Sequence, residues 1–264
     1  MTPLPDGAER RLGEAIRRLG RPGFEEALWG FLRCALAPDD LLVLALRDAA
    51  PPERLFARAD DPAPFARLDS VYLAGAYLLD PFHALHLDRA PAGAYRLHDI
   101  APDAFQRSRY FVDYFRQTTI LDEVTFVAWP RAEASVQISL GRDGASGRPF
   151  SAREVETCQR LAPLLAALAE THWAMLPGGP GPRPDVAGRL AEALRVARGV
   201  RLSPRQAEVA LLILQGHSTA SIALRLGVSP QTVKVFRKQL YARCGLTSQA
   251  ELFSLLVPLL SGRP

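Results

Sequence analysis

Lysine is the residue that this sequence most nearly lacks. Of 32 basic residues, only Lys234 and Lys238 are lysines. A phosphate-binding loop of the GxxxxGK type requires a lysine. A phosphoacceptor receiver domain requires one beside its aspartates, yet residues 1–176 contain none. The sequence therefore argues against ATP hydrolysis, and against phosphorylation of a receiver domain, as its means of regulation.

Cysteines and long apolar runs are scarce as well. The three cysteines lie far apart and form no CxxC pair, so neither a disulfide framework nor a cysteine metal site is expected. No apolar run approaches the roughly 18 residues that a membrane span needs. Residues 1–21 contain acidic residues and lack the apolar segment of a secretory signal. We therefore expect a globular protein of the cytoplasm with no membrane partner.

Motifs for metal binding and catalysis are missing too. His83 and His86 have the spacing of a helical metal pair, with Asp80 and Asp88 nearby, but no cluster supplies a third ligand. There is no Gly-x-Ser-x-Gly elbow, and His98 beside scattered serines is not a triad signal. We expect no metal, no cofactor and no catalytic residue, and hence not an enzyme.

The charge that is present is unevenly distributed. Residues 200–264 contain 8 basic and 2 acidic side chains, a net charge of +6, and residues 177–199 contain 4 and 2, a net charge of +2. Residues 1–176 contain 20 basic and 24 acidic side chains, a net charge of −4. A basic excess confined to one end is what contact with nucleic acid phosphates requires.

The basic end contains a pattern that is typical of a helix-turn-helix. Ile222, Ala223 and Leu226 share one face of a first helix, which Gly227 can end. Ser229 can cap a second helix, on which Val233 and Phe236 are expected to be buried. The outer face of that helix then carries Ser229, Gln231, Lys234, Val235 and Lys238, with Thr232 and Arg237 beside them. An ordinary helical hairpin in a globular domain is the alternative.

Two further helices flank this pair. Residues 202–216 predict a helix capped by Ser203, and Ser248 and Glu251 have the spacing of a capping box before an apolar helix. The four-helix run resembles the LuxR-type DNA-binding domain. The residues that carry the resemblance are Leu202 to Val209, Gly216, Ser218, Ile222, Ala223, Leu226 to Ser229, Thr232 to Val235, Gly245 and Leu246.

The resemblance assigns roles within this region. It implies that Lys234, Val235 and Lys238 face DNA bases in the major groove. Phosphate contacts would come from Thr232 and Arg237, and from Ser218 and Ser229 through helix N-termini. A homodimer on double-stranded DNA is expected, with Leu252, Leu255, Leu256 and the helix over 151–175 as dimer surfaces. Internal core is the alternative role for those leucines.

The rest of the chain predicts an α+β domain. Strands are expected over 41–46, 54–59, 94–98, 124–129 and 135–140, and helices over 6–20, 24–37, 65–79, 102–117 and from Ser151 onward. This order predicts an antiparallel sheet of about five strands with helices on its faces, in the style of PAS, GAF and autoinducer-binding domains. We expect a sensing and dimerisation domain at 1–176, a Pro/Gly linker with a short helix at 177–199, and an all-α DNA-binding domain at 200–264.

Residues 72–81 resemble the Tyr…Tyr-x-x-Asp-Pro segment of autoinducer-binding LuxR-family proteins. The resemblance implies that tyrosines line a ligand pocket and that Asp80 accepts a ligand amide N–H. Aromatic side chains with a polar end suit a small ligand. The ligand-binding candidates are Tyr72, Tyr77, Asp80, Phe111, Tyr114, Phe126 and Trp129. Each could instead be plain core, and Asp80 could cap a turn.

These patterns together predict a transcription regulator controlled by a small organic effector of unknown identity. Its expected partners are double-stranded DNA, the effector, a second copy of the chain and RNA polymerase. One rival is a ligand-independent regulator whose first domain only dimerises or binds a protein. The other is an enzyme with an appended helix-turn-helix.

Overall fold

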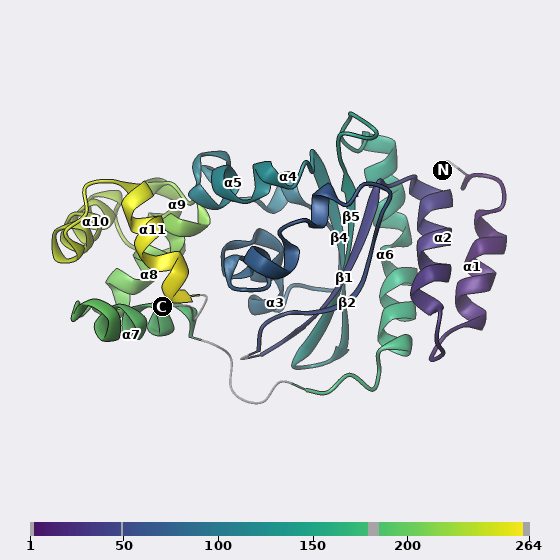
Figure 1. The fold of residues 1–264 in the computed structure, drawn as a ribbon, viewed down its shortest axis with the longest axis horizontal. Helices are drawn as coiled ribbons and strands as arrows, with labels where there is room; N and C mark the ends of the chain where they lie inside the picture. Colours follow the sequence, from purple (N-terminus) through teal and green to yellow (C-terminus); the bar gives the residue numbers. More distant parts are fainter. Residues whose placement is uncertain (1–2, 49, 179–184, 261–264) are drawn as a thin grey trace. The chain divides into compact units, whose positions relative to one another are not determined.

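The computed structural model describes residues 3–48, 50–178 and 185–260, which form two compact units (Figure 1). The first unit contains the chain up to Ala66, Leu85–Ile100 and Thr119–Pro182. The second contains Arg67–Ala84, Ala101–Thr118 and the chain from Arg183 onward. Two segments of the N-terminal region thus belong to the same unit as the C-terminal helices. Residues 179–184 of the predicted linker lie outside the described ranges.

The first unit is built on a five-stranded antiparallel sheet, as predicted. Its strands are β1 (Asp40–Arg47), β2 (Glu53–Ala59), β3 (Gly93–Arg96), β4 (Asp122–Arg131) and β5 (Ala134–Arg142). The strand order is β2-β1-β5-β4-β3, so β1–β2 and β4–β5 are the expected hairpin pairs. All nine residues of β5 are buried, because this strand is paired on both edges at the centre of the sheet.

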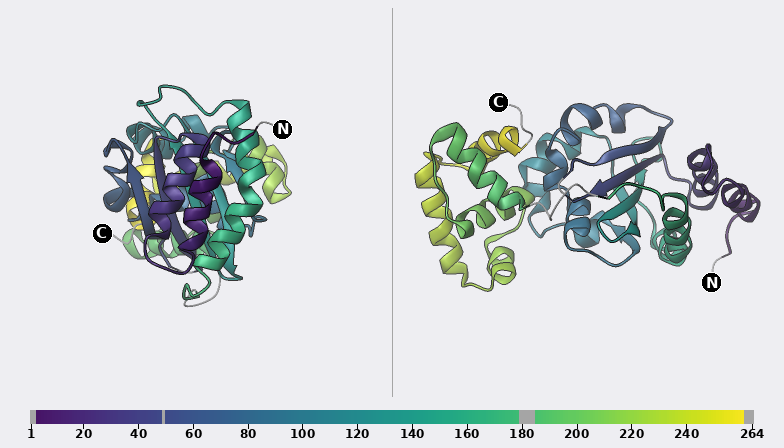
Figure 2. Two further views of the ribbon diagram at one scale, coloured as in Figure 1. Left: turned by 90° about the vertical axis from the view of Figure 1, so that its right-hand side faces the viewer. Right: turned by 90° about the horizontal axis from the view of Figure 1, so that it is seen from below.

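The long helices of this unit lie on one side of the sheet (Figure 1). They are α1 (Ala8–Arg17), α2 (Phe24–Leu36) and α6 (Ala152–His172), and Figure 2 shows them side by side. Phe24, Phe31, Leu165, Phe126 and Ile138 are among the fully or almost fully buried side chains of the core between these helices and the sheet. Helix α1 begins at Ala8 and ends at Arg17, inside the range 6–20 expected for it.

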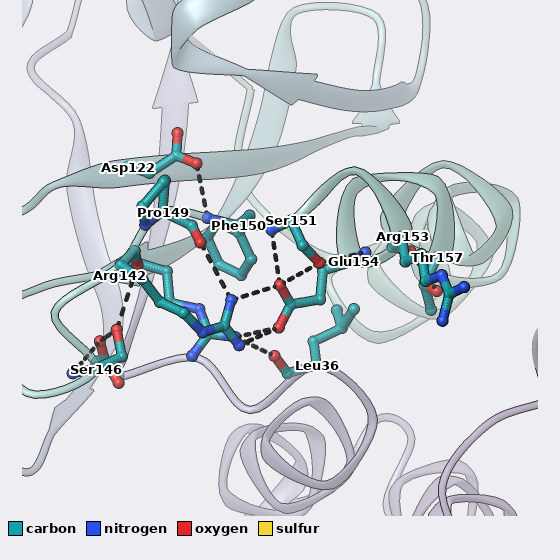
Figure 3. Close-up of polar contacts among 12 residues, drawn as sticks. Leu36, Asp122, Arg142, Ser146, Pro149, Phe150, Ser151, Arg153, Glu154 and Thr157 are labelled. Atoms are coloured by element: carbon teal, nitrogen blue, oxygen red, sulfur yellow. Dashed lines mark hydrogen bonds and ion pairs between the residues drawn. The ribbon is translucent and has the colours of Figure 1, made fainter.

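The start of α6 is fixed to the sheet by a charged network (Figure 3). Helix α6 follows Ser151, as expected, and Ser151 and Glu154 form a capping box. The buried guanidinium of Arg142 binds the Glu154 carboxylate and donates to the Leu36 carbonyl at 3.0 Å. Arg148 Nη1 donates to Glu154 Oε2 at 2.8 Å. Hydrogen bonding by Arg148, with help from Ser151 and the charge of Arg142, lowers the pKa of Glu154 to about 2.

The second unit contains five helices from the C-terminal region. They are α7 (Val186–Arg198), α8 (Pro204–Gln215), α9 (Thr219–Leu226), α10 (Pro230–Cys244) and α11 (Gln249–Leu260). Ser203, Ser218 and Ser229 each cap the helix that follows, through a side-chain oxygen that accepts a backbone N–H. The sequence prediction that the C-terminal region is all-α is therefore confirmed.

The two N-terminal segments of this unit differ from the prediction. Residues 65–79 do not form one helix: a turn η1 (Ala63–Phe65), a π-helical turn η2 (Leu68–Tyr72) and η3 (Ala76–Leu79) replace it, and Gly75 between the last two has a non-helical φ of 153°. Residues 102–117 form η4 (Phe105–Arg107), α5 (Arg109–Asp113) and η5 (Phe115–Gln117). Ser108 starts α5 afresh because its hydroxyl accepts the Phe111 N–H at 3.1 Å.

Smaller differences concern the segments between the strands. The short segment after Asp80 is a helix, α3 (Pro81–Leu87), and the strand expected over 94–98 ends at Arg96, where α4 (Leu97–Ile100) begins. Helix α6 continues through Pro163 without a break. In the described ranges, no helix is both long enough and apolar enough to cross a membrane.

Candidate functional site

The predicted helix-turn-helix is formed by α9, a turn and α10. Helix α9 ends at Gly227, whose φ of 64° lies in the left-handed region, and the Val228 N–H donates back to the Ala223 carbonyl at 3.0 Å. Ala223 is 4% exposed, and Val233 at the start of α10 is fully buried. The small side chain of Ala223 and the buried Val233 are what a close crossing of two short helices requires. Phe236, expected to be buried, is half-buried.

The exposed side of α10 carries the residues proposed to read DNA. Gln231, Lys234, Val235 and Lys238 are exposed, and Val235 is 44% accessible although it is apolar. A valine held out in solvent between two lysines contributes nothing to the core, which fits a role in contact with a partner. This face is therefore open to a DNA groove.

The flanking candidates have local partners on the same helix. Thr232 and Ser229 are linked through their hydroxyls at 2.8 Å, and the Thr232 N–H donates to Ser229 Oγ at 3.0 Å. The Arg237 guanidinium lies 5.3 Å from the ring centroid of Tyr241, one turn further along. These contacts hold the polar ends of the side chains close to the helix surface.

A buried glutamine holds α10 against α8, and sequence reasoning missed it. Gln206 is 2% exposed, and its Nε2 donates to Gln239 Oε1 at 2.9 Å. Arg243 Nη1 donates to Gln206 Oε1 at 2.9 Å and to the Arg201 carbonyl at 2.9 Å. Gln206 also completes the capping box of Ser203, and that spacing was the only sequence signal for it.

Ser218 lies at the N-terminus of α9. Its hydroxyl accepts the Ser221 N–H at 3.2 Å, and the Ser221 hydroxyl lies 2.8 Å from Nδ1 of His217. Burial, reinforced by the positive charge of Arg225, lowers the pKa of His217 to about 4. The imidazole is therefore neutral at pH 7, and the Ser218 N–H at the N-terminus of α9 donates to Asp103 Oδ1 at 2.9 Å.

In the second unit, the best-defined part of the effector candidates is a buried tyrosine–aspartate pair. Tyr72 Oη donates to Asp80 Oδ2 at 2.6 Å, and the Phe82 N–H donates to Asp80 Oδ1 at 2.8 Å. Burial raises the pKa of Asp80 to about 6, although its hydrogen bonds, including one from Tyr110, act in the opposite direction. Asp80 thus both starts the turn into α3 and binds a tyrosine, so the two interpretations of this residue are compatible.

Five of the seven effector candidates belong to the second unit. The Tyr72 ring stacks on that of Tyr114 with centroids 5.7 Å apart, and the Tyr77 ring lies 6.4 Å from Tyr72. Phe111 stacks on Phe115 at 5.5 Å. The three tyrosines are 5–7% exposed. The structure therefore gathers Tyr72, Tyr77, Asp80 and Tyr114 into one buried aromatic cluster with a carboxyl group.

The other two candidates lie on β4 in the first unit. Phe126 is 2% exposed and is part of the core between the sheet and the helices, which is the plain-core role. Trp129 is half-buried: its Nε1 donates to the Ala90 carbonyl at 2.8 Å, and its ring stacks on His86 at 5.4 Å. The Arg89 guanidinium lies 5.0 Å from the centroid of the same ring, so Trp129 is held by contacts of the first unit, and Phe126 supports the fold.

Comparison with known proteins shows the family to which this chain belongs. Residues 200–256 match the family described as "Bacterial regulatory proteins, luxR family". Over 185 residues the chain is 30% identical to a protein of Aeromonas salmonicida named as an HTH-type transcriptional regulator in the exeN 3'region, covering 67% of this chain and 93% of that protein. The chain belongs to the LuxR family of bacterial regulatory proteins.

Solved structures resemble this LuxR-family chain as well. The VqsR ligand-binding domain of Pseudomonas aeruginosa matches at 26% identity with a TM-score of 0.53, over 64% of this chain and 97% of that one. Escherichia coli SdiA matches at 18% identity with a TM-score of 0.42, over 97% of this chain and 99% of that one. The family and the curated relative make this protein a DNA-binding transcription regulator and not an enzyme.

The histidines considered as a metal pair have structural partners in this LuxR-family protein. His86 Nδ1 lies 2.7 Å from Ser135 Oγ, and its Nε2 lies 3.2 Å from Asp48 Oδ1. The His83 ring meets the Tyr77 ring edge-on at 4.9 Å. Within the ranges that the structure describes, no three potential ligands are grouped to hold a metal ion. Ser135 and His86 are at most 1% exposed, so their hydrogen bond joins a strand to a helix inside the fold.

The leucines considered as dimer surfaces divide into two groups. Leu252 and Leu256 are fully buried inside the second unit, which is the internal-core alternative, and Leu255 is half-buried. On α6, Leu161, Leu165 and Leu168 face the core. Of the apolar positions proposed for dimerisation on α11, only Leu255 therefore keeps accessible surface.

Proposed function

We propose that a small organic effector, bound in the N-terminal region, controls DNA binding by this LuxR-family regulator. The observation that carries the proposal is the buried Tyr72–Asp80 pair, whose oxygens are 2.6 Å apart. A carboxyl group whose pKa burial raises to about 6 destabilises the fold, and such groups concentrate at functional sites. The likeness to a ligand-binding domain, with a TM-score of 0.53, supports the same assignment.

The cluster defines the chemistry of the effector. Asp80 is an acceptor held in an aromatic environment, so the effector would offer an N–H or O–H donor on a largely apolar body. Tyr72, Tyr77 and Tyr114 would contact the apolar body through their rings and its polar groups through their hydroxyls. Phe111, in the same unit, is proposed as a further contact, and Trp129 and Phe126 of the first unit stay sequence-based candidates.

At the DNA-binding end, α10 is the helix proposed to enter the major groove. Lys234, Val235 and Lys238 on its exposed face would contact base edges, with Gln231 at its N-terminal end. Phosphate contacts would come from Thr232, Arg237, Ser218 and Ser229. Two copies would bind two half-sites, because a pair of weakly binding domains gains affinity when joined. The proposed place of action is double-stranded DNA in the cytoplasm, with RNA polymerase as a further proposed partner.

The test uses the Tyr72→Phe and Asp80→Asn variants of the full chain. Extracts of the producing cells and a panel of apolar small molecules bearing an amide are screened by thermal shift against wild-type protein, and duplex DNA selected by the protein is used in gel shifts. A true effector raises the wild-type melting temperature and changes DNA affinity, and both effects shrink in the two variants. Tyr95→Phe is the matched control, since the Tyr95 hydroxyl donates to the Pro91 carbonyl at 2.7 Å and Tyr95 belongs to the first unit.

The alternative is a ligand-independent regulator whose N-terminal domain dimerises or binds a protein. It predicts no small-molecule stabilisation, and equal responses of Tyr72→Phe and Tyr95→Phe. Operator affinity would then depend on protein concentration alone, through dimerisation.

A further inference from the structure

Inside the second unit, the segment that begins at Asp103 lies against the turn between α8 and α9. The Ser218 N–H donates to Asp103 Oδ1 at 2.9 Å. One residue on, the Ala104 N–H donates to the Gly216 carbonyl at 3.0 Å. These two bonds join a segment from the N-terminal region to the entrance of the first helix of the helix-turn-helix.

The approach at this point is close enough to need a glycine. Gly216 has a φ of +96°, and a Cβ at this position would lie 2.9 Å from the Phe105 Cα. Nearby, Gln215 Nε2 donates to the Leu78 carbonyl at 3.4 Å. The α8–α9 turn is therefore held to Leu78 and to residues 103–105 by three hydrogen bonds, of which one joins backbone groups only.

The group that Asp103 binds is an anion-binding position. A helix N-terminus carries unsatisfied N–H groups and the positive end of the helix dipole, which favour phosphate or carboxylate. Hydrogen bonds from Ser218 lower the pKa of Asp103, so the carboxylate is ionised at neutral pH. An exposed carboxylate thus stands where a DNA phosphate would be bound.

We propose that Asp103 is an intramolecular competitor of DNA, whose carboxylate occupies the α9 N-terminus in place of a backbone phosphate. The proposal rests on the proposed phosphate contact of Ser218 and is independent of effector control. The reading face of α10 stays exposed at Lys234 and Lys238. DNA can therefore contact α10 first, but a phosphate can bind the N-terminus of α9 only when the Asp103 carboxylate leaves Ser218.

The experiment compares full-length Asp103→Asn and Asp103→Ala with the charge-matched control Asp99→Asn, with no effector added. Asp99 is 65% exposed on its side chain and pairs with His98 on the surface. Removing one negative charge strengthens DNA binding in all three variants. Loss of the competitor should make both Asp103 variants bind about two- to fivefold more tightly than Asp99→Asn, from the usual strength of a charge at a helix N-terminus.

The DNA probe is a duplex selected from random sequences by the wild-type protein, at one fixed salt concentration. Amide hydrogen exchange at Ser218 gives a second readout. Its exchange should be faster in the Asp103 variants than in wild type, and DNA should slow it in the variants. Equal affinities of Asp103→Asn and Asp99→Asn, or weaker binding by Asp103→Asn, would overturn the proposal. Because effector is absent throughout, failure of effector control leaves this result readable.

Discussion

Replacing Asp80 with asparagine should flatten the dependence of folding stability on pH. Burial raises the pKa of Asp80 to about 6 from an ordinary value of 3.8. The folded state therefore holds this proton more tightly than the unfolded chain. The neutral carboxyl contributes its full stability below the unfolded pKa, and that contribution is lost as the pH rises through 3.8 towards 6. Across the whole range the loss is about 3 kcal/mol.

Part of this change falls in a convenient window. Between pH 5 and pH 7.5 the linkage relation gives a loss of about 1 kcal/mol in the free energy of unfolding from Asp80 alone. In Asp80→Asn the amide oxygen can accept the Phe82 N–H, and the amide nitrogen can donate to Tyr72 Oη. The variant can therefore keep the bonds to Tyr72 and Phe82 and has no proton to lose.

Urea unfolding gives the free energy of unfolding of wild type and Asp80→Asn at pH 5 and pH 7.5. The effect of Asp80 is the loss between the two pH values in wild type minus the loss in the variant. Other titrating groups cancel because they are present in both proteins. Among these other groups, Asp40 has the most strongly raised pKa. Burial raises this pKa to about 7, with help from the acidic neighbours Asp143 and Asp39. If both proteins lose the same stability between the two pH values, Asp80 is already ionised in the folded state, and the argument that it strains the cluster fails.

Two further predictions concern exposed charges. Lys238→Ala should flatten the salt dependence of DNA binding by about one unit if Lys238 contacts a phosphate, or weaken binding by about 1–3 kcal/mol if it reads a base; a gel shift with unchanged affinity and salt slope would contradict both roles. Glu154→Gln should lower the free energy of unfolding at pH 7 by about 1 kcal/mol, after allowance for solvent screening of a partly exposed ion pair with Arg148. Since the folded pKa of Glu154 is depressed to about 2, this deficit should shrink as the pH falls below 4.5; urea midpoints of both proteins at pH 7 and pH 3.5 measure it.

Local patterns predicted the elements whose signals are local. Ser151 with Glu154 and Ser203 at the start of α8 show their caps within three residues of sequence, and the structure forms both capping boxes. The exposure of Gln231, Lys234, Val235 and Lys238 on one side of α10 followed from helical spacing in the same way. These features depend on neighbours one turn away, so composition and spacing are sufficient to find them.

The aromatic segments show where such reasoning ends. Residues 65–79 and 102–117 have helical spacing of apolar side chains, but packing fixes them as short turns, with Ser108 starting a new helix. Spacing alone cannot separate one amphipathic helix from several turns that bury the same side chains. The contact between Asp103 and Ser218 joins positions 115 residues apart, and no local pattern encodes it.

A path of ring contacts runs through the second unit from the buried aromatic cluster around Asp80 towards the α8–α9 turn. The Tyr72 ring lies 5.7 Å from Tyr114, which lies 5.5 Å from Tyr110, which lies 6.0 Å from Phe105. Phe105 follows Asp103 by two residues. An effector that displaced Tyr72 from Asp80 would therefore act on a packed row of rings that ends beside the proposed competitor of DNA. Adjacency of this kind is only a reason to test for coupling, since packed rings can also respond independently.

A double-mutant cycle decides whether Tyr72 and Asp103 are coupled through these rings or respond independently. DNA affinity is measured for wild type, Tyr72→Phe, Asp103→Asn and the double variant, without effector and at fixed salt. If a change at Tyr72 is transmitted along these rings, Tyr72→Phe already weakens the contact between Asp103 and Ser218. Asp103→Asn then raises DNA affinity less in the double variant than in the wild-type background. The interaction free energy should then reach about 0.5 kcal/mol or more. If the two effects add within about 0.3 kcal/mol, the aromatic cluster and the Asp103 contact are separate devices, and an effector would have to act on DNA binding by another route.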